Sequence, residues 1–229
     1  MISYLFFLLF TIIYFLHLTS RIPELGLIRF DFILMGITLL FAMLEGYASL
    51  NVNLKTTKLL LILIAFVLLT LPFVQWPGSV IRNGLENYSK VIFFYFFTVF
   101  IINTRGRLKL FIAVFLLCQI FRILEPSYLH ITAGYWGDVA YANTAGGFQQ
   151  KLARLSGAPH DVVNPNQLAW VIVSIIPFLY YLAWHRSGAV LKLAVVSLLP
   201  VLIYALFLTG SRSGLLSLLV VLSAMMFKG

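Results

Sequence analysis

The chain has 229 residues, of which 62% are hydrophobic and 10% are charged, against roughly 45–50% and 25% in a soluble globular domain. This composition excludes a soluble enzyme and a disordered segment. The net charge is +9, but in so apolar a chain an excess of Lys and Arg reports membrane topology rather than a nucleic-acid interface. The single cysteine, Cys118, lies in an apolar run, so no disulfide framework or cysteine metal site is available. The sequence therefore predicts an all-α, polytopic integral membrane protein whose partner is the lipid bilayer and not a nucleic acid.

Apolar stretches long enough to cross a bilayer recur along the whole chain. A membrane helix needs about 20 such residues, and shorter runs suffice where flanking side chains reach the interface. Eight stretches qualify: residues 2–19, 28–44, 59–76, 88–103, 108–124, 167–184, 190–208 and 214–227. The first has neither a basic start nor a small-residue cleavage site, so we interpret it as a retained anchor and not a signal peptide. We expect one transmembrane domain, 1–229, with a single long loop at 125–166.

The orientation of the chain follows from its charged loops. With the N-terminus inside, Lys and Arg divide equally between the two sides, so their number alone does not decide. Short loops count more than long ones, and the short connections near residues 104–109 and 185–188 are basic and free of acid. All but one of the seven acidic residues fall on the other side. We therefore expect a cytoplasmic N-terminus and an extracytoplasmic long loop.

The end of the long loop carries two local patterns. Phe148, Leu152 and Leu155 recur at the spacing of one helical face, which predicts a short interfacial helix with its apolar side on the membrane. Further on, Asn164 is a good helix N-cap and Pro165 suits the first helical position. The sixth span is therefore expected to begin at the outer surface, with the positive end of its dipole facing outward.

A tight turn joins the seventh and eighth spans. Gly210 and Gly214 bracket Ser211, Arg212 and Ser213, so the chain reverses within a few residues. Ionisable residues between long apolar stretches are costly, and their first interpretation is functional. The turn and the loop end thus predict two outward-facing helix N-termini, each close to an arginine. Such ends bind anions, and Arg binds phosphate in a bidentate manner, so a pyrophosphate-linked lipid is the expected ligand.

Simpler interpretations of these residues stay open. A lone arginine at a helix turn often only reaches the interface with its charged head, and this applies to Arg154 and to Arg212. His160 is either a solvated loop residue or a candidate acid–base group. The remaining histidines, which have no evident partner nearby in the sequence, are interpreted as structural: His17, His130 and His185.

Three short motifs together resemble the bacterial O-antigen ligase and O-antigen polymerase superfamily. They are RLSG at 154–157, NPN at 164–166 and TGSRSG at 209–214, in that order. The stretch TSRIPELGLIRFDFIL at 19–34 is also similar to members that handle capsule, exopolysaccharide or lipopolysaccharide glycans. The resemblance corresponds to the N-terminal two-thirds of a typical member.

The resemblance implies a glycosyl transfer that uses no metal or cofactor, on the outer face of the bacterial inner membrane. The donor would be an undecaprenyl-pyrophosphate-linked glycan, and the acceptor another glycan or a lipid A core sugar. Arg154 and Arg212 would be the catalytic residues that hold the pyrophosphate and stabilise charge on the leaving group. The motifs also imply substrate contacts at these positions: Gly157, Asn164, Asn166, Ser211 and Ser213.

The chain departs from that family at its end. It stops at Gly229, before the large outer loop in which such members place a catalytic histidine. We therefore expect little turnover by this chain alone. Three explanations stay open: the sequence is the N-terminal portion of a longer or split gene, with a second membrane chain supplying the rest in the split case; it is truncated; or it is a shortened member that binds the lipid-linked glycan without transferring it. Two other functions stay open: a transporter or flippase for a lipid-linked anion, and a non-catalytic membrane subunit.

Overall fold

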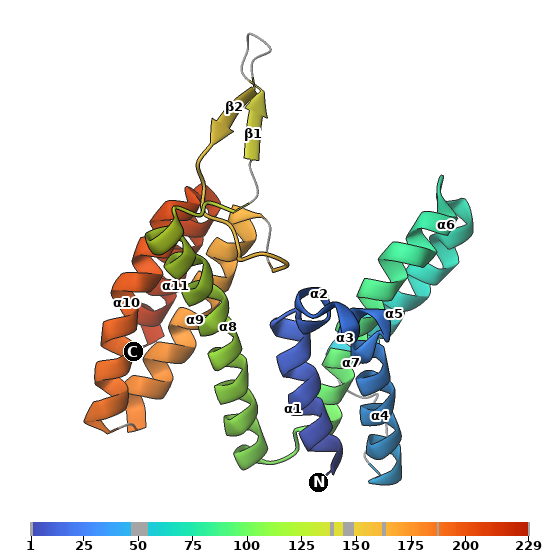
Figure 1. Ribbon diagram of the computed structural model, residues 1–229. Helices are drawn as coiled ribbons and strands as arrows, with labels where there is room; N and C mark the ends of the chain where they lie inside the picture. Colours follow the sequence, from blue (N-terminus) through green and yellow to red (C-terminus); the bar gives the residue numbers. More distant parts are fainter. Residues whose placement is uncertain are drawn as a thin grey trace. The chain divides into compact units, whose positions relative to one another are not determined.

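The protein is almost entirely helical, as the sequence predicts (Figure 1). The computed structural model describes residues 2–46, 55–137, 140–143, 149–161, 164–186 and 188–228. Each predicted span overlaps one long helix. These helices are α1 (Ile2–Phe15), α4 (Phe30–Leu44), α5 (Lys55–Thr70), α7 (Glu86–Ile101), α8 (Arg105–Ala133), α9 (Pro165–Arg186), α10 (Ala189–Thr209) and α11 (Arg212–Lys228).

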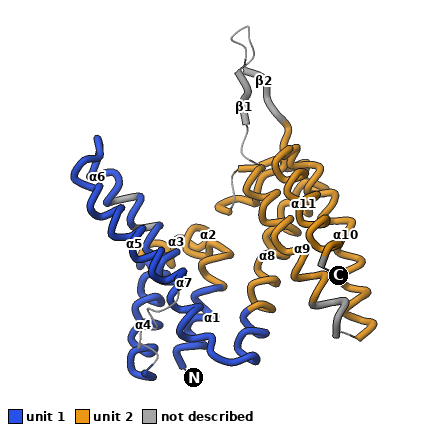
Figure 2. The backbone as a smooth tube through the Cα atoms, turned by 180° about the vertical axis from the view of Figure 1, so that it is seen from behind, with its two compact units in different colours: residues 1–11, 28–111 blue, residues 12–27, 112–229 orange. Residues whose placement is uncertain are grey.

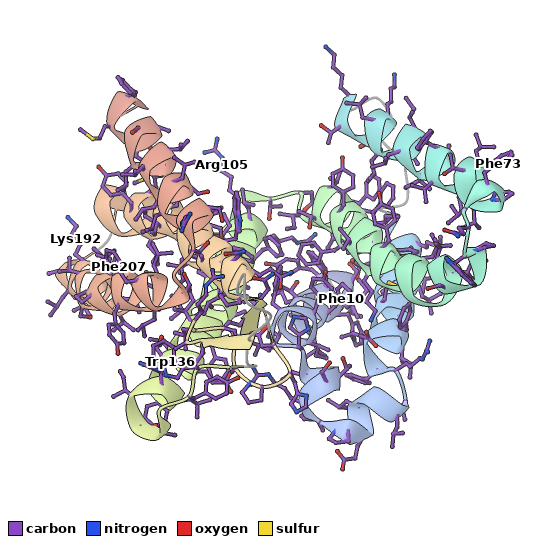
Figure 3. All side chains as sticks on the ribbon, turned by 90° about the horizontal axis from the view of Figure 1, so that it is seen from above. Phe10, Phe73, Arg105, Trp136, Lys192 and Phe207 are labelled. Atoms are coloured by element: carbon purple, nitrogen blue, oxygen red, sulfur yellow. The ribbon has the colours of Figure 1, made fainter. Side chains whose placement is uncertain are left out.

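Two of the described stretches are long and apolar enough to cross a membrane, Lys55–Phe73 and Ala189–Thr209. Shorter apolar helices accompany them, at Ile2–Phe15, Phe30–Leu44, Tyr88–Ile101 and Arg212–Phe227. The outer surfaces of these stretches carry large apolar side chains: Phe73, three residues after the end of α5, and Phe207 on α10 lie on the periphery (Figure 3) and are 88% and 65% exposed.

Short helical pieces connect the long helices. α2 (Leu18–Arg21) and α3 (Pro23–Leu27) link α1 to α4, and η1 (Leu71–Phe73), α6 (Pro77–Ser79) and the π-helical η2 (Val80–Leu85) link α5 to α7. α1 ends before the predicted limit of the first span, because His17 takes a left-handed backbone conformation with φ of 50°. That conformation interrupts a right-handed helix.

The chain divides into two compact units, residues 1–11 with 28–111 and residues 12–27 with 112–229 (Figure 2). The core of the first is aromatic. Phe7 and Phe10 are fully buried, and the ring of Phe7 lies 5.8 Å from that of Phe97 and 5.4 Å from that of Phe111. An ion pair of 2.6 Å between Lys90 of α7 and Asp31 of α4 joins two helices of this unit.

The core of the second unit is built around α9, which packs against both α10 and α11 (Figures 1 and 2). Its fully buried side chains are aliphatic: Leu155, Leu168, Ala169, Ile172, Ile175, Leu202 and Ala205. Gly214 allows α11 to approach closely, because a Cβ there would lie 2.5 Å from the Cβ of Ala169. A glycine is therefore required where α11 crosses α9.

The long connection between α8 and α9 differs from expectation. α8 continues through Pro126 to Ala133, so the chain leaves the helix at Gly134 and not at Glu125. β1 (Ala140–Asn143) and β2 (Gln149–Leu152) then form an antiparallel pair, with Ala140 opposite Leu152.

The predicted interfacial helix is wrong for the part that the structure describes. Residues 149–152 belong to β2, and residues 153–157 are not helical; Phe148 lies outside the described residues. The backbone N–H of Leu155 donates to the carbonyl oxygen of Leu208 at 2.9 Å, and its side chain is fully buried. An N–H used in a tertiary hydrogen bond is not available to a local helix. The side chain of Leu155, which was expected to lie on the membrane, is instead buried in the protein core.

We expect Gly214→Ala to destabilise the second unit by about 1–3 kcal/mol, because the added methyl group overlaps a rigid Cβ in a packed core. Gly36→Ala in α4 is the matched control, since a Cβ at Gly36 meets nothing within 4 Å. That change should leave stability equal or higher. Thermal unfolding of the detergent-solubilised variants measures both effects, and equal melting temperatures for the two variants would contradict the close approach of α11 to α9.

Candidate functional site

The structure brings Arg154 to the turn between α10 and α11. Its Nε donates to the carbonyl oxygen of Thr209 at 2.7 Å, and its Nη2 donates to Oδ1 of Asn166 at 2.8 Å. The guanidinium lies against Gly210, where a Cβ would be 3.4 Å from Nε. A guanidinium has five N–H donors, so these two bonds leave others able to bind a ligand. Arg154 therefore links the first turn of α9 to the turn that carries Arg212.

The turn itself has the geometry of a helix end followed directly by a helix start. Gly210 ends α10 with φ of 56°, and its N–H donates to the carbonyl oxygen of Phe207. Ser211 is buried and caps α11, since its Oγ accepts from the N–H of Gly214 at 3.1 Å. The Oγ of Ser213 lies 3.1 Å from that of Ser211. Because Ser211 satisfies only part of the first turn, α11 presents remaining N–H groups beside Arg212.

Arg212 is the first residue of α11, and its side chain is exposed. Among the described residues, none forms a hydrogen bond or ion pair with its guanidinium. A positive charge at a helix N-terminus is unfavourable to the helix dipole. Nothing in the described fold compensates Arg212, and an anion placed at the turn would compensate both the arginine and the dipole.

The start of α9 follows the sequence prediction. Asn164 precedes the helix, its Oδ1 accepts from the N–H of Asn166 at 2.8 Å, and its carbonyl oxygen accepts from Gln167 and Leu168. Pro165 is the first helical residue. Asn164 is thus a helix cap, while Asn166 uses its side chain to hold Arg154.

Gly157 lies in the non-helical segment 153–161, of which residues 155–158 and Asp161 are buried. Its carbonyl oxygen accepts from the hydroxyl of Tyr135 at 3.0 Å, and the neighbouring N–H of Ser156 donates to the carbonyl oxygen of Trp136 at 3.2 Å. Gly157 is buried, so in the described structure it is part of the backbone that crosses the core and not a surface contact for a ligand.

Sequence analysis missed a cluster of charged residues at the far end of the same segment. Asp161 accepts from Nε of Arg122 at 2.9 Å to each carboxylate oxygen, and Nη2 of Arg122 lies 2.7 Å from Oδ1. Arg21 binds Glu125 through two bonds of 2.7 Å. These four side chains, hereafter the ion cluster, all belong to the second unit. Arg122 and Glu125 lie three residues apart on α8, which was the only local signal in the sequence.

Three contacts surround the ion cluster. His17 Nε2 lies 3.6 Å from Asp161, Arg21 lies 3.9 Å from Asp161, and Nη1 of Arg122 donates to Gln119 at 3.1 Å. The hydrogen bond to Glu125 raises the pKa of Arg21 above its already high ordinary value, so Arg21 stays charged. His17, expected to have no partner, thus contacts a residue far away in the sequence.

The other histidines occupy different surroundings. His160 is exposed with φ of 64°, and no described residue hydrogen bonds to its ring, so an acid–base role stays a prediction. His130 Nδ1 lies 2.9 Å from the carbonyl oxygen of Tyr135, and its ring packs on Trp136 (Figure 3) at 4.3 Å. Since a carbonyl oxygen only accepts, Nδ1 of His130 carries the proton in this contact.

No group of three or more His, Cys, Asp or Glu side chains in the described part of the chain could hold a metal ion. A scan of protein-family models and searches of curated proteins and of solved structures found no match for this chain. The interpretation of the site therefore depends on its own geometry and on the sequence motifs.

The two arginines should differ in their effect on stability. Arg154→Ala leaves Thr209 and Asn166 without their donor, and losing hydrogen bonds from a charged group costs about 1–3 kcal/mol. Arg212→Ala removes no described contact, and we expect a change within about 0.5 kcal/mol. Thermal unfolding in detergent tests this difference; an equal loss in both variants would contradict the hydrogen bonds described for Arg154.

Proposed function

We propose that the protein is a multi-pass membrane glycosyltransferase of the O-antigen ligase or polymerase type. It acts at the outer face of the bacterial inner membrane, in surface polysaccharide biosynthesis. The donor is an undecaprenyl-pyrophosphate-linked glycan, and the acceptor is another glycan or a lipid A core sugar. One observation carries the proposal: Arg154, although distant in sequence, is bonded to the turn at which Arg212 begins α11.

The pairing of charges supports the alternation of spans on which the proposed topology depends, and it is the same for either orientation of the whole chain. Three ion pairs join residues that all lie on the outer side when the N-terminus is inside: Arg21 with Glu125, Arg122 with Asp161, and Lys90 with Asp31. In the first unit, the hydroxyl of Tyr4 donates to the carbonyl oxygen of Arg107, and both residues are assigned to the inner side. A topology with the opposite arrangement of any one span would separate such partners by the thickness of the bilayer.

In the proposed reaction, the site stabilises the pyrophosphate as the leaving group. When the bond between the sugar and the pyrophosphate breaks, its electron pair stays on a pyrophosphate oxygen. Arginine N–H groups and a helix N-terminus held in advance at that oxygen lower the energy of the transition state without reorganising. Arg212 supplies unbonded donors, and Arg154 supplies the donors left over from its contacts with Thr209 and Asn166.

The same geometry suits a second function, a subunit that binds the lipid-linked anion and leaves the transfer to another membrane chain. Binding needs only the arginines and the start of α11, whereas transfer also needs a group that takes the proton of the acceptor hydroxyl. Transfer of glycan to an added acceptor in proteoliposomes that contain this chain alone would favour the enzyme. Binding without transfer would favour the subunit, and flipping of the lipid would favour a transporter.

The proposed topology makes a labelling prediction. In a Cys118→Ala background, Ser213→Cys should react with a membrane-impermeant maleimide on intact spheroplasts, because the α10–α11 turn faces outward. Arg105→Cys, at the exposed start of α8, should react only after permeabilisation. The reverse pattern would show the opposite orientation. Labelling of both residues in intact spheroplasts would also contradict the proposed topology.

The proposed ligand makes a binding prediction. Arg212→Ala should weaken the binding of undecaprenyl pyrophosphate to the protein in nanodiscs by about tenfold or more, since a charge-assisted contact of this kind is worth at least 1.4 kcal/mol. Arg105→Ala is the matched control, because Arg105 is also exposed and also the first residue of a helix. Unchanged affinity for the Arg212 variant, or equal losses for both, would contradict a specific anion site at α11.

A further inference from the structure

Segment 153–161 carries Arg154 near one end and Asp161 at the other. Between them, Leu155, Ser156 and Ala158 are buried, although the segment has no helix or strand of its own. Only tertiary contacts hold it in place. The N–H of Leu155 donates to α10 and that of Ser156 donates to the carbonyl oxygen of Trp136, so the position of Arg154 depends on where the whole segment is fixed.

Asp161 is the most constrained side chain of the segment. Its carboxylate is 1% exposed and accepts in a bidentate manner from Arg122, whose side chain is 8% exposed. Arg122 is fixed in turn by Gln119, one turn earlier on α8. The pair therefore joins the segment to a buried position of α8, and its bidentate geometry fixes the relative orientation of the two side chains as well as their separation.

A buried ion pair of this kind is a poor source of net stability. Removing two charges from water costs nearly as much as their attraction returns, and apolar side chains of similar size often serve stability as well or better. What an apolar contact lacks is direction, because it tolerates sliding and rotation that a bidentate guanidinium–carboxylate pair does not. The physical advantage of Arg122 and Asp161 is therefore in placing the segment.

We infer that Arg122 and Asp161 are positioning residues for Arg154. The pair fixes the path of segment 153–161 and thereby holds the guanidinium of Arg154 at the α10–α11 turn, ready for a pyrophosphate-bearing lipid. The inference rests on the proposed function for its ligand, and on contacts of the second unit alone for its geometry.

The surroundings of the pair allow it to be replaced without leaving a buried charge. Arg21 also approaches Asp161, but its main partner is Glu125, through two bonds of 2.7 Å. His17, the other neighbour of Asp161, has a side chain that is 44% exposed and so has access to water. In the double variant Arg122→Met with Asp161→Leu, Arg21 therefore keeps Glu125 as its partner and the ring of His17 keeps its access to water.

The experiment compares this double variant with a matched one, Lys90→Met with Asp31→Leu, which replaces the partly buried ion pair of the first unit. Hydrogen exchange reports the position of the segment. In the Arg122/Asp161 variant we expect the amides of Leu155 and Ser156 to exchange about tenfold faster or more, while α9–α11 keep their protection. The matched variant should leave the exchange of the segment unchanged.

Binding of undecaprenyl pyrophosphate in nanodiscs reports the consequence for Arg154. We expect about tenfold weaker binding in the Arg122/Asp161 variant, with a melting temperature close to that of the parent. Adding Arg154→Ala to this variant should weaken binding by less than about twofold, although the same change weakens the parent strongly, because residues that act as a unit are not additive.

Three outcomes would overturn the inference. One is unchanged exchange in segment 153–161 after the pair is replaced. Another is loss of protection throughout α9–α11, which would make the pair a general structural element. The third is full additivity with Arg154→Ala. Failure of the proposed function would give a different result, because Arg154→Ala and Arg212→Ala would then not weaken the binding of undecaprenyl pyrophosphate to the parent chain. Hydrogen exchange would still decide whether Arg122 and Asp161 position the segment.

Discussion

The hydrogen bond from Arg154 to the carbonyl oxygen of Thr209 is the interaction on which the rest of the candidate site depends. A helix C-terminus leaves carbonyl oxygens without partners inside the helix, and Thr209 is the last residue of α10. Arg154 satisfies one of them with a charged donor and reaches Asn166 with another nitrogen. One side chain thereby joins the end of α10, the beginning of α9 and the turn into α11. The N–H of Leu155, which donates to the carbonyl oxygen of Leu208, holds the backbone of the loop at the same helix end.

A second constraint comes from the burial of segment 153–161. Buried backbone groups must be paired, and a segment without a helix or ladder of its own finds those partners elsewhere in the fold. Leu155 donates to α10, Ser156 donates to the stretch that follows α8, and the Tyr135 hydroxyl donates to Gly157. These bonds join the segment to two parts of the second unit, the end of α10 and the stretch that follows α8. A loop held in this way can carry a functional side chain with little freedom to move, which is what preorganised stabilisation of charge requires.

The pairing of the charged side chains follows from the same constraint, because a buried charge also needs a partner. In a chain with 10% charged residues, buried ions have few available partners. Arg21 and Arg122 find theirs in Glu125 and Asp161, while Arg212 stays exposed without a described partner. Arg21 and Arg122 therefore orient parts of the fold, whereas the guanidinium of Arg212 has no partner among the described residues. Composition alone treats all of them as one basic excess.

The sequence by itself determined the features that depend on near neighbours. The helical stretches, the cap at Asn164 with Pro165, and the glycine turn around Ser211 are set by residues a few positions apart, and all are present. The predicted helix across Leu152 and Leu155 was wrong, because β-pairing and a bond to α10 replace its local hydrogen bonds. Only the tertiary structure decided that Arg154 meets Thr209 and that Arg122 meets Asp161. Side-chain partners so far apart along the chain leave no periodic signal, because their meeting depends on how the helices pack and not on the spacing of residues within any one of them.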